Sequence, residues 1–67
     1  MRSVRFHREI YRGAAVDEAV KLLERFATLT RKEESEHWVV EVSAPSEARE
    51  RRVALELTNH ALTLSRA

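Results

Sequence analysis

The chain has no cysteine, one glycine and one proline among its 67 residues. Without cysteine it can form neither a disulfide nor a thiolate metal site, and one glycine is too few for a glycine-rich phosphate loop. No apolar run is long enough to span a membrane, and the arginine-rich start lacks the apolar stretch of a secretion signal. We therefore expect a cytoplasmic protein that does not interact with membranes.

Composition and length indicate one small folded domain. Hydrophobic residues make up 43% of the chain and charged residues 34%, which is typical of a globular domain. The net charge of +1 is too small for a general nucleic-acid binder. A single domain over residues 1–67 is near the lower limit for a core without staples. We therefore expect a subunit interface to add stability.

The first half of the chain predicts a strand and then a helix. Apolar residues alternate over residues 3–11, where Val4, Phe6 and Ile10 share one face. After the break at Arg12-Gly13, residues 14–26 carry the apolar stripe of an amphipathic helix, formed by Val16, Ala19, Val20, Leu23 and Phe26.

The stretch after this helix has two interpretations. The helix could continue to Glu34, or residues 27–32 and 37–43 could form a hairpin. Thr28 and Thr30 flank Leu29 in an alternating β-branched pattern that helices disfavour, so we predict the hairpin. Its core-facing residues would be Ala27, Leu29, Trp38, Val40 and Val42, with Val39 and Glu41 outside.

A long final helix is predicted over residues 46–65. Pro45 ends the sheet and Ser46 can cap the helix. The main apolar stripe is Val53, Leu57, Ala61 and Leu64, and Leu55 and Leu62 form a second line beside Asn59. So wide an apolar face exceeds the needs of one small sheet. The charged run Arg49–Arg52 is interpreted as a solvated first half.

These elements define an α+β fold, a two-layer βαββα arrangement that resembles a truncated ferredoxin-like (split βαβ) domain. A right-handed crossover makes the first two strands parallel with the third between them, giving strand order 1-3-2 and both helices on one face. The first strand would lie at an open edge. The other sheet face would carry Arg5, His7, Glu9, Tyr11, Thr28, Thr30, Val39 and Glu41.

No catalytic or cofactor-binding constellation is visible. His7, His37 and Glu41 have a plausible zinc-ligand composition, but no local ligand spacing supports a site, and surface histidines are the simpler interpretation. Glu33, Glu34 and Glu36 fall in a solvated loop. We therefore predict no catalytic, metal-binding or cofactor-binding residues and a protein that is not an enzyme.

The basic start of the chain contains Arg2, Arg5, Arg8 and Arg12. These arginines could bind an acidic peptide or a nucleic-acid backbone. Charges on an edge strand also block unwanted pairing, and we favour that interpretation.

Several segments resemble the HxsD-like family. They are the strand ending in Ile10-Tyr11, the helix closing on Phe26, the valine-rich strand over 37–43 and the segment Glu56–Leu62 with its Glu-x-x-Asn spacing. The resemblance implies an accessory protein of the His-Xaa-Ser radical SAM peptide-maturation systems, without cofactor or catalytic residues of its own. In form alone, the element order is also similar to a small dimerising scaffold subunit of a tRNA-modification complex.

We therefore predict a non-enzymatic binding or scaffold module that acts through the open sheet edge and the apolar face of the last helix. Its partner would be a protein or peptide, with a homodimer also expected. The alternatives are a nucleic-acid-associated domain and a dimerising scaffold of an RNA-modification complex. The candidate partner-binding residues are Arg5, His7, Glu9, Leu55, Glu56, Asn59 and Leu62.

Overall fold

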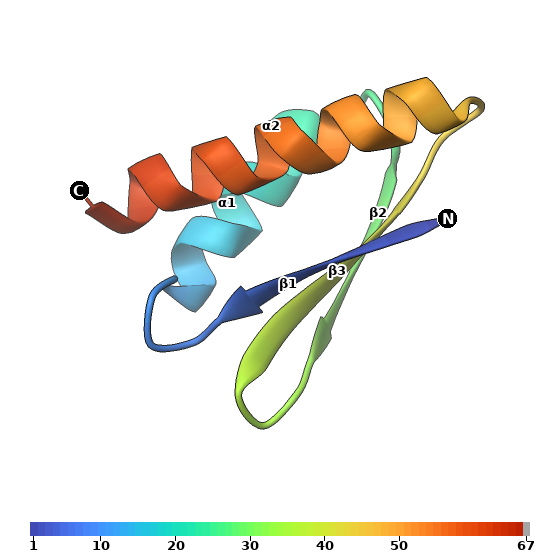
Figure 1. Cartoon of the computed structure of the whole chain (residues 1–67). Coiled ribbons are helices and arrows are strands. Elements are labelled where there is room, and N and C mark those ends of the chain that lie inside the picture. The colour runs from blue at the N-terminus through green and yellow to red at the C-terminus, as the bar shows by residue number, and fades with distance from the viewer. Residues whose placement is uncertain (67) are drawn as a thin grey trace.

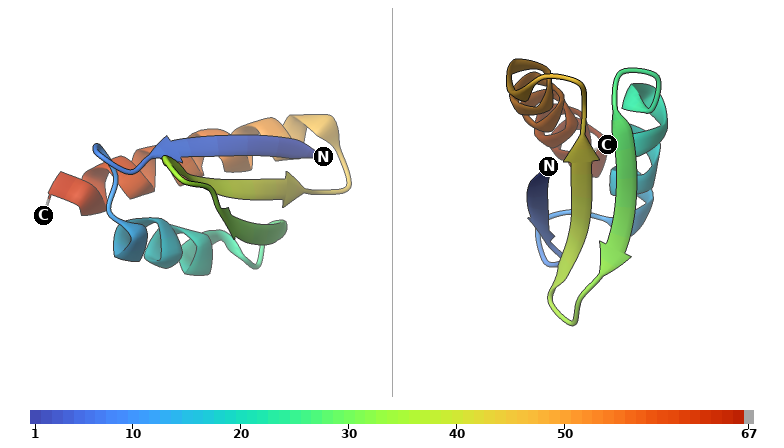
Figure 2. Two further views of the ribbon diagram at one scale, coloured as in Figure 1. Left: turned by 90° about the horizontal axis from the view of Figure 1, so that it is seen from below. Right: turned by 90° about the vertical axis from the view of Figure 1, so that its right-hand side faces the viewer.

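The computed structural model describes residues 1–66 and shows two layers, a three-stranded sheet and a pair of helices (Figures 1 and 2). Ala67, the last residue of the expected domain, lies outside the described residues. The elements are β1 (Arg2–His7), α1 (Gly13–Leu23), β2 (Thr28–Glu33), β3 (His37–Ser43) and α2 (Glu47–Arg66).

The predicted topology is confirmed. The strand order is β1-β3-β2, and β3 runs antiparallel to both neighbours, so β1 and β2 are parallel to each other. Both helices cover one face of the sheet, with α2 beside β1 and α1 beside β2 (Figure 2). The hairpin interpretation of residues 27–43 is therefore correct, and the helix does not extend to Glu34.

β1 ends four residues earlier than predicted. The carbonyl oxygen of His7 accepts the N–H groups of Ile10 and Tyr11 at 3.0 and 2.9 Å, which turns the chain back. Tyr11 then packs edge-on against Phe6, with ring centroids 4.9 Å apart. The predicted alternation therefore fails after His7: Tyr11 joins the core instead of the open face, and Ile10, expected inside, is 63% exposed.

α1 is also shorter than predicted. It ends at Leu23, and the N–H of Phe26 bonds to the Leu23 carbonyl in a tight turn. Phe26 was expected in the buried stripe and is 47% exposed. The helix begins at Gly13, where a Cβ would lie only 3.0 Å from Trp38 Cζ2, so the tryptophan packs directly against the first turn.

The core lies between the sheet and the two helices. Val40, Val42 and Phe6 from the sheet meet Val16 from α1 and Leu57 from α2, and all are essentially buried. The inward positions predicted for β3 are therefore correct. Val39 points to the opposite face as predicted, yet it is only 7% exposed because Arg5 and Lys32 flank it on the neighbouring strands.

α2 begins as the sequence predicts. The N–H of Arg49 donates to the Ser46 hydroxyl at 3.2 Å, which is the hydrogen bond of an N-cap. The stripe of Val53, Leu57 and Ala61 is buried against the sheet and α1. Leu55 lies on the outer side of the helix and is 62% exposed.

Candidate partner-binding edge

The outer side of β1 carries unpaired backbone groups at alternate residues. The N–H of Arg8 donates to the carbonyl of Glu36, which continues the register of the β1–β3 pair. In an antiparallel ladder, both polar groups of every second residue point to the same side. The groups of Val4 and Phe6 therefore point to β3, and those of Ser3 and Arg5 and the N–H of His7 point outward. The outward carbonyl of His7 is already taken, because it accepts the N–H groups of Ile10 and Tyr11. Within residues 1–66 no strand lies on that outer side.

A flank of α2 runs along β1. Glu47, Ala54, Thr58 and Ser65 recur seven, four and seven residues apart, which places them on one line of the helix. At one end of this line, Glu47 lines a hollow together with Met1 and Arg2. At the other end, the Ser65 hydroxyl accepts the N–H of Arg12, which follows the turn after β1, at 3.2 Å. The line therefore faces the β1 side of the molecule.

The middle of this flank is small and apolar. Thr58 donates its hydroxyl to the carbonyl of Ala54 at 3.0 Å, so its methyl group is left for contact. Leu62 lies one turn further along and Val4 faces the flank from β1, and both are half-buried. We call Val4, Ala54, Thr58 and Leu62 the edge band.

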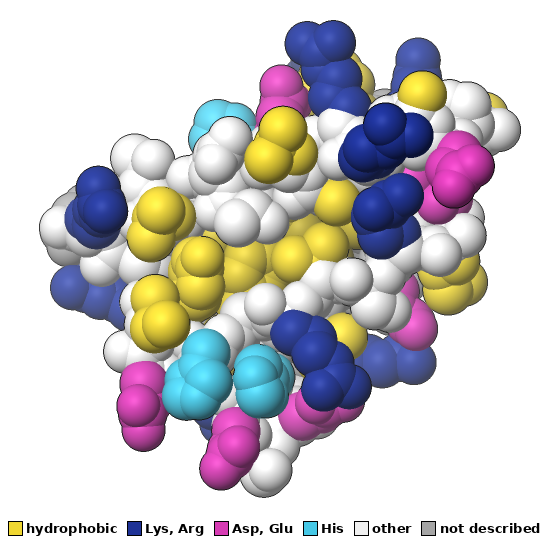
Figure 3. All heavy atoms as spheres, viewed as in Figure 1, with side chains coloured by type: hydrophobic (Ala, Val, Ile, Leu, Met, Phe, Trp, Pro, Cys, Tyr) yellow, Lys and Arg dark blue, Asp and Glu magenta, His cyan; other side chains and the backbone are white. Residues whose placement is uncertain are grey.

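Figure 3 views the molecule from the β1 side and shows hydrophobic side chains between α2 and the sheet, with basic side chains near both ends of this apolar strip. The edge strand therefore borders apolar surface as well as free backbone groups. An added strand could use both.

The open face of the sheet is polar and its charges are largely paired. Arg5 Nη2 lies 3.4 Å from Glu34 Oε2, and Lys32 Nζ lies 3.1 Å from Glu41 Oε1. These pairs lie on either side of the buried Val39. Most of this face is therefore suited to water, and Arg5 is the charged side chain that it presents at the β1 edge.

His7 and His37 meet on the open face. They are direct cross-strand partners, with ring centroids 5.0 Å apart and planes at 75°. Glu41 pairs with Ser3 toward the other end of the ladder, so the structure does not bring together the three residues that have the composition of a zinc site. Among residues 1–66, no three His, Asp or Glu side chains are grouped to hold a metal ion.

The hydrogen bonding of His7 also constrains its chemistry. Its Nδ1 accepts the N–H of Glu9 at 3.2 Å, which leaves the proton of the neutral ring on Nε2. A metal could bind Nε2 only if the proton moved to Nδ1. Nδ1 could then no longer accept the hydrogen bond from the N–H of Glu9. Nε2 is therefore arranged to donate a hydrogen bond.

The structure spreads the seven candidate residues over several parts of the surface. Arg5 and His7 lie on the open face, and Glu9 is exposed in the turn after β1. Leu55, Asn59 and Leu62 lie together on the outer side of α2, four and three residues apart. Glu56, three residues before Asn59, lines a groove of about 530 Å³ together with Phe26 and Val53. The seven candidate residues therefore do not form one continuous site.

The four N-terminal arginines also point in different directions. Arg5 lies on the open face, whereas Arg2 faces the helix layer. The Arg8 guanidinium stacks 3.9 Å from the centroid of the Trp38 ring, and Arg12 precedes α1. They follow one edge of the molecule but do not share a face.

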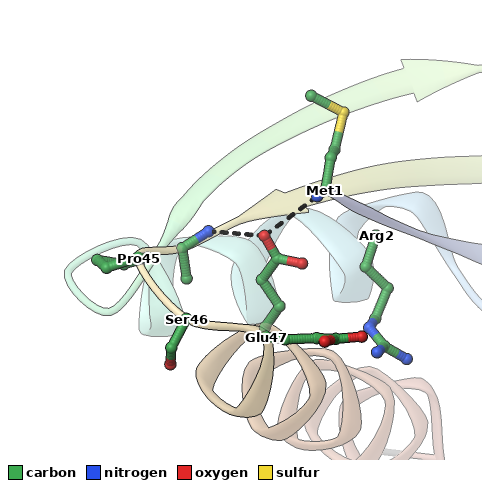
Figure 4. A pocket seen from close by; sticks show the side chains of 7 residues that line it. Met1, Arg2, Pro45, Ser46 and Glu47 are labelled. Atoms are coloured by element: carbon green, nitrogen blue, oxygen red, sulfur yellow. Dashed lines mark hydrogen bonds and ion pairs between the residues drawn. The ribbon is translucent and has the colours of Figure 1, made fainter.

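Sequence reasoning missed the role of Glu50. It was expected in a solvated run, yet it is only 8% exposed. One carboxylate oxygen accepts the N–H of Ala44 at 3.2 Å and lies 3.2 Å from the Met1 amino group (Figure 4). The hydrogen bond from Ala44 and then the amino group lower the pKa of Glu50 below its ordinary value. Its spacing from Val53 and Leu57, three and seven residues, was the signal that it lies on the buried stripe.

In the part of the chain that the structure describes, neither helix combines the length and apolar character needed to cross a membrane. Comparison of the chain with protein-family models, with curated proteins and with solved structures finds no match.

Proposed function

We propose that this protein is a non-enzymatic binding module that takes up a segment of a protein or peptide as an added strand beside β1. The observation that carries the proposal is the outward alternation of Ser3, Arg5 and His7 next to the edge band. Backbone hydrogen bonds give affinity in strand addition, and the side-chain surface beside the edge gives selectivity.

The resemblance to the HxsD-like proteins supports an accessory role in peptide maturation. In that setting the added strand would belong to the peptide that is modified or to the enzyme that modifies it. We propose a cytoplasmic location for this role, which the cysteine-free sequence suits.

Selection from a displayed library of random peptides tests the binding function. Arg5→Pro removes an outward N–H, so we expect selected peptides to bind this variant at least about tenfold more weakly than the wild type. Glu33→Pro is the matched control, because Glu33 lies at the outer side of β2 and its N–H also points outward. Peptides that bind all three proteins equally, or a selection that enriches none, would contradict the proposal.

A second candidate function is a homodimeric scaffold that pairs through the outer side of α2. Leu55, at 62% exposure beside Leu62 and Asn59, favours it. Sedimentation equilibrium tests this function with Leu55→Glu, and His60→Glu on another exposed part of the helix serves as the control. We expect only the Leu55 variant to lower the association constant. A wild type that sediments as a monomer at high concentration rules out this function.

A further inference from the structure

The proposed strand addition leaves the chemistry of the added segment open, and the charges of β1 bear on it. Residues 2–8 contain three arginines and no acid: Arg2, Arg5 and Arg8. Among residues 1–66, the only ion pair that Arg5 makes, with Glu34, joins side chains that are 62% and 44% exposed. Such a pair is weak and readily exchanged. An incoming carboxylate can therefore recruit Arg5.

From this edge we infer that the occupant is an extended acidic peptide whose carboxylates alternate with apolar side chains. This inference rests on the proposed strand addition. Residues opposite Ser3, Arg5 and His7 would place their side chains on the open face. There the Arg5 guanidinium and the His7 Nε2–H can both bind a carboxylate.

The intervening residues of the peptide meet a different surface. Their side chains point to the helix layer and lie over the edge band. Ala54 is 9% exposed, and Val4, Thr58 and Leu62 are half-buried, so part of their apolar surface stays uncovered. A side chain of moderate size, such as valine, would cover these groups. The two faces of the edge thus select acid and apolar residues in alternation.

A second copy of the chain fits this edge less well. Each copy brings three arginines to the shared seam. In the symmetric antiparallel register centred on Arg5, that residue lies directly opposite its own copy and Arg2 lies opposite Arg8. Like charges opposite each other destabilise a strand pair. A basic strand is therefore a poor partner for itself and a good one for an acidic strand.

A nucleic acid also fits less well. Its phosphates would need basic groups on one surface, whereas Arg5 and Arg2 lie on opposite faces of β1. An adjacent strand reaches both faces, because its own side chains alternate in the same way.

The test uses two labelled peptides as long as β1, one alternating glutamate with valine and one alternating lysine with valine. We measure binding by fluorescence anisotropy to the wild type, to Arg5→Glu and to Arg5→Pro. We expect the glutamate peptide to bind the wild type and to weaken with added salt. The Arg5→Glu variant should bind it at least about tenfold more weakly and bind the lysine peptide better than the wild type does. Arg5→Pro should bind neither peptide, and Glu33→Pro should behave as the wild type.

The outcomes separate the inference from the proposed function. If the lysine peptide binds the wild type as well as the glutamate peptide does, the acidic occupant is wrong and strand addition stands. Self-association that Arg5→Pro abolishes would make a second copy of the chain the occupant. The acidic-peptide inference would then be wrong, and strand addition would stand. An oligonucleotide that binds more tightly than the glutamate peptide would overturn the acidic-peptide inference. Binding of the glutamate peptide that survives in Arg5→Pro, or no binding of either peptide by a monomeric wild type, would overturn strand addition as well.

Discussion

The two edges of the sheet are strands of six residues each, but different side chains lie between each edge strand and the neighbouring helix. At β2, Arg31 points toward the helix layer, where its Nε lies 2.8 Å from Asp17 Oδ1 of α1 and its guanidinium lies 4.8 Å from the centroid of the Trp38 ring. At β1, the corresponding border with α2 is the apolar edge band. An ion pair therefore closes the gap between sheet and helix at one edge, and small apolar groups line it at the other.

This difference means that the two unpaired edges would not accept an added strand equally well. Both strands have outward backbone groups at alternate residues, since the N–H of Glu34 bonds to His37 and sets the register of β2 as Arg8 sets that of β1. At β2 the bordering charges must be desolvated before a strand can add, which is costly. At β1 the border gains from being covered.

The largest expected effect on stability comes from the apolar side chains that the two edge strands place in the core. Phe6 is 1% exposed, whereas Leu29 of β2 is only half-buried. We expect Phe6→Ala to lower the free energy of unfolding by about 3–5 kcal/mol, enough to unfold much of so small a domain, and Leu29→Ala by about 2 kcal/mol or less. Urea denaturation followed by circular dichroism measures both. Equal losses of stability would mean that the two edge strands are anchored equally in the core.

Proline substitutions test the alternation of the backbone groups. Val4→Pro removes an N–H that bonds to β3 and should cost about 3 kcal/mol. In Arg5→Pro the lost N–H points outward, so we expect a cost of about 1 kcal/mol or less, as in Glu33→Pro. Amide exchange of the wild type gives an independent measurement, with Val4 and Phe6 protected and Ser3, Arg5 and His7 exchanging quickly. Protection of Arg5 in the isolated monomer would contradict the assigned ladder.

Strong period-two and period-3.6 patterns made most of the fold predictable. The alternation in Val4–Phe6 and Trp38–Val42 identified two strands, and the turn chemistry at Pro45-Ser46 located the start of α2. The helix stripe through Val53, Leu57 and Ala61 marked its buried side. The pattern failed where a tertiary contact overrode it, because Tyr11 turns inward to meet Phe6.

The candidate site was less predictable for a physical reason. Sequence spacing gives the face of a residue but not which surfaces adjoin. It therefore grouped the outer side of α2 with the β1 edge, whereas the flank that adjoins the edge contains Ala54 and Thr58 and shares only Leu62 with the outer side. Small residues at such positions carry no hydrophobic signal. The strand register that brings His7 beside His37 also depends on the fold and not on local spacing.

The ion pair at the β2 edge gives a smaller effect. Asp17 is half exposed, and Arg31 Nε lies close to it without a hydrogen-bonding alignment. We expect Asp17→Asn to cost about 0.2–1 kcal/mol at low salt, and less at high salt, because such pairs are screened. Glu18→Gln, an exposed neighbour on α1, is the control. A cost that is larger and independent of salt would show that packing, not charge, closes this edge.

Glu50 ties the start of β1 to α2, as Asp17 ties β2 to α1, and its contribution should appear as a dependence of stability on pH. Its pKa in the folded protein is lowered, first by the N–H of Ala44 and then by the Met1 amino group. A lowered folded-state pKa contributes stability that is fully present above the ordinary value of 4.5 and is lost as the pH falls through the lowered value. Thermal melts of the wild type should therefore lose stability on acidification below that value, and Glu50→Gln should lose less. Glu47→Gln, exposed in the first turn of α2, should follow the wild type. If Glu50→Gln and the wild type respond alike to acid, this carboxylate does not anchor β1, and the two edges differ only in their apolar border.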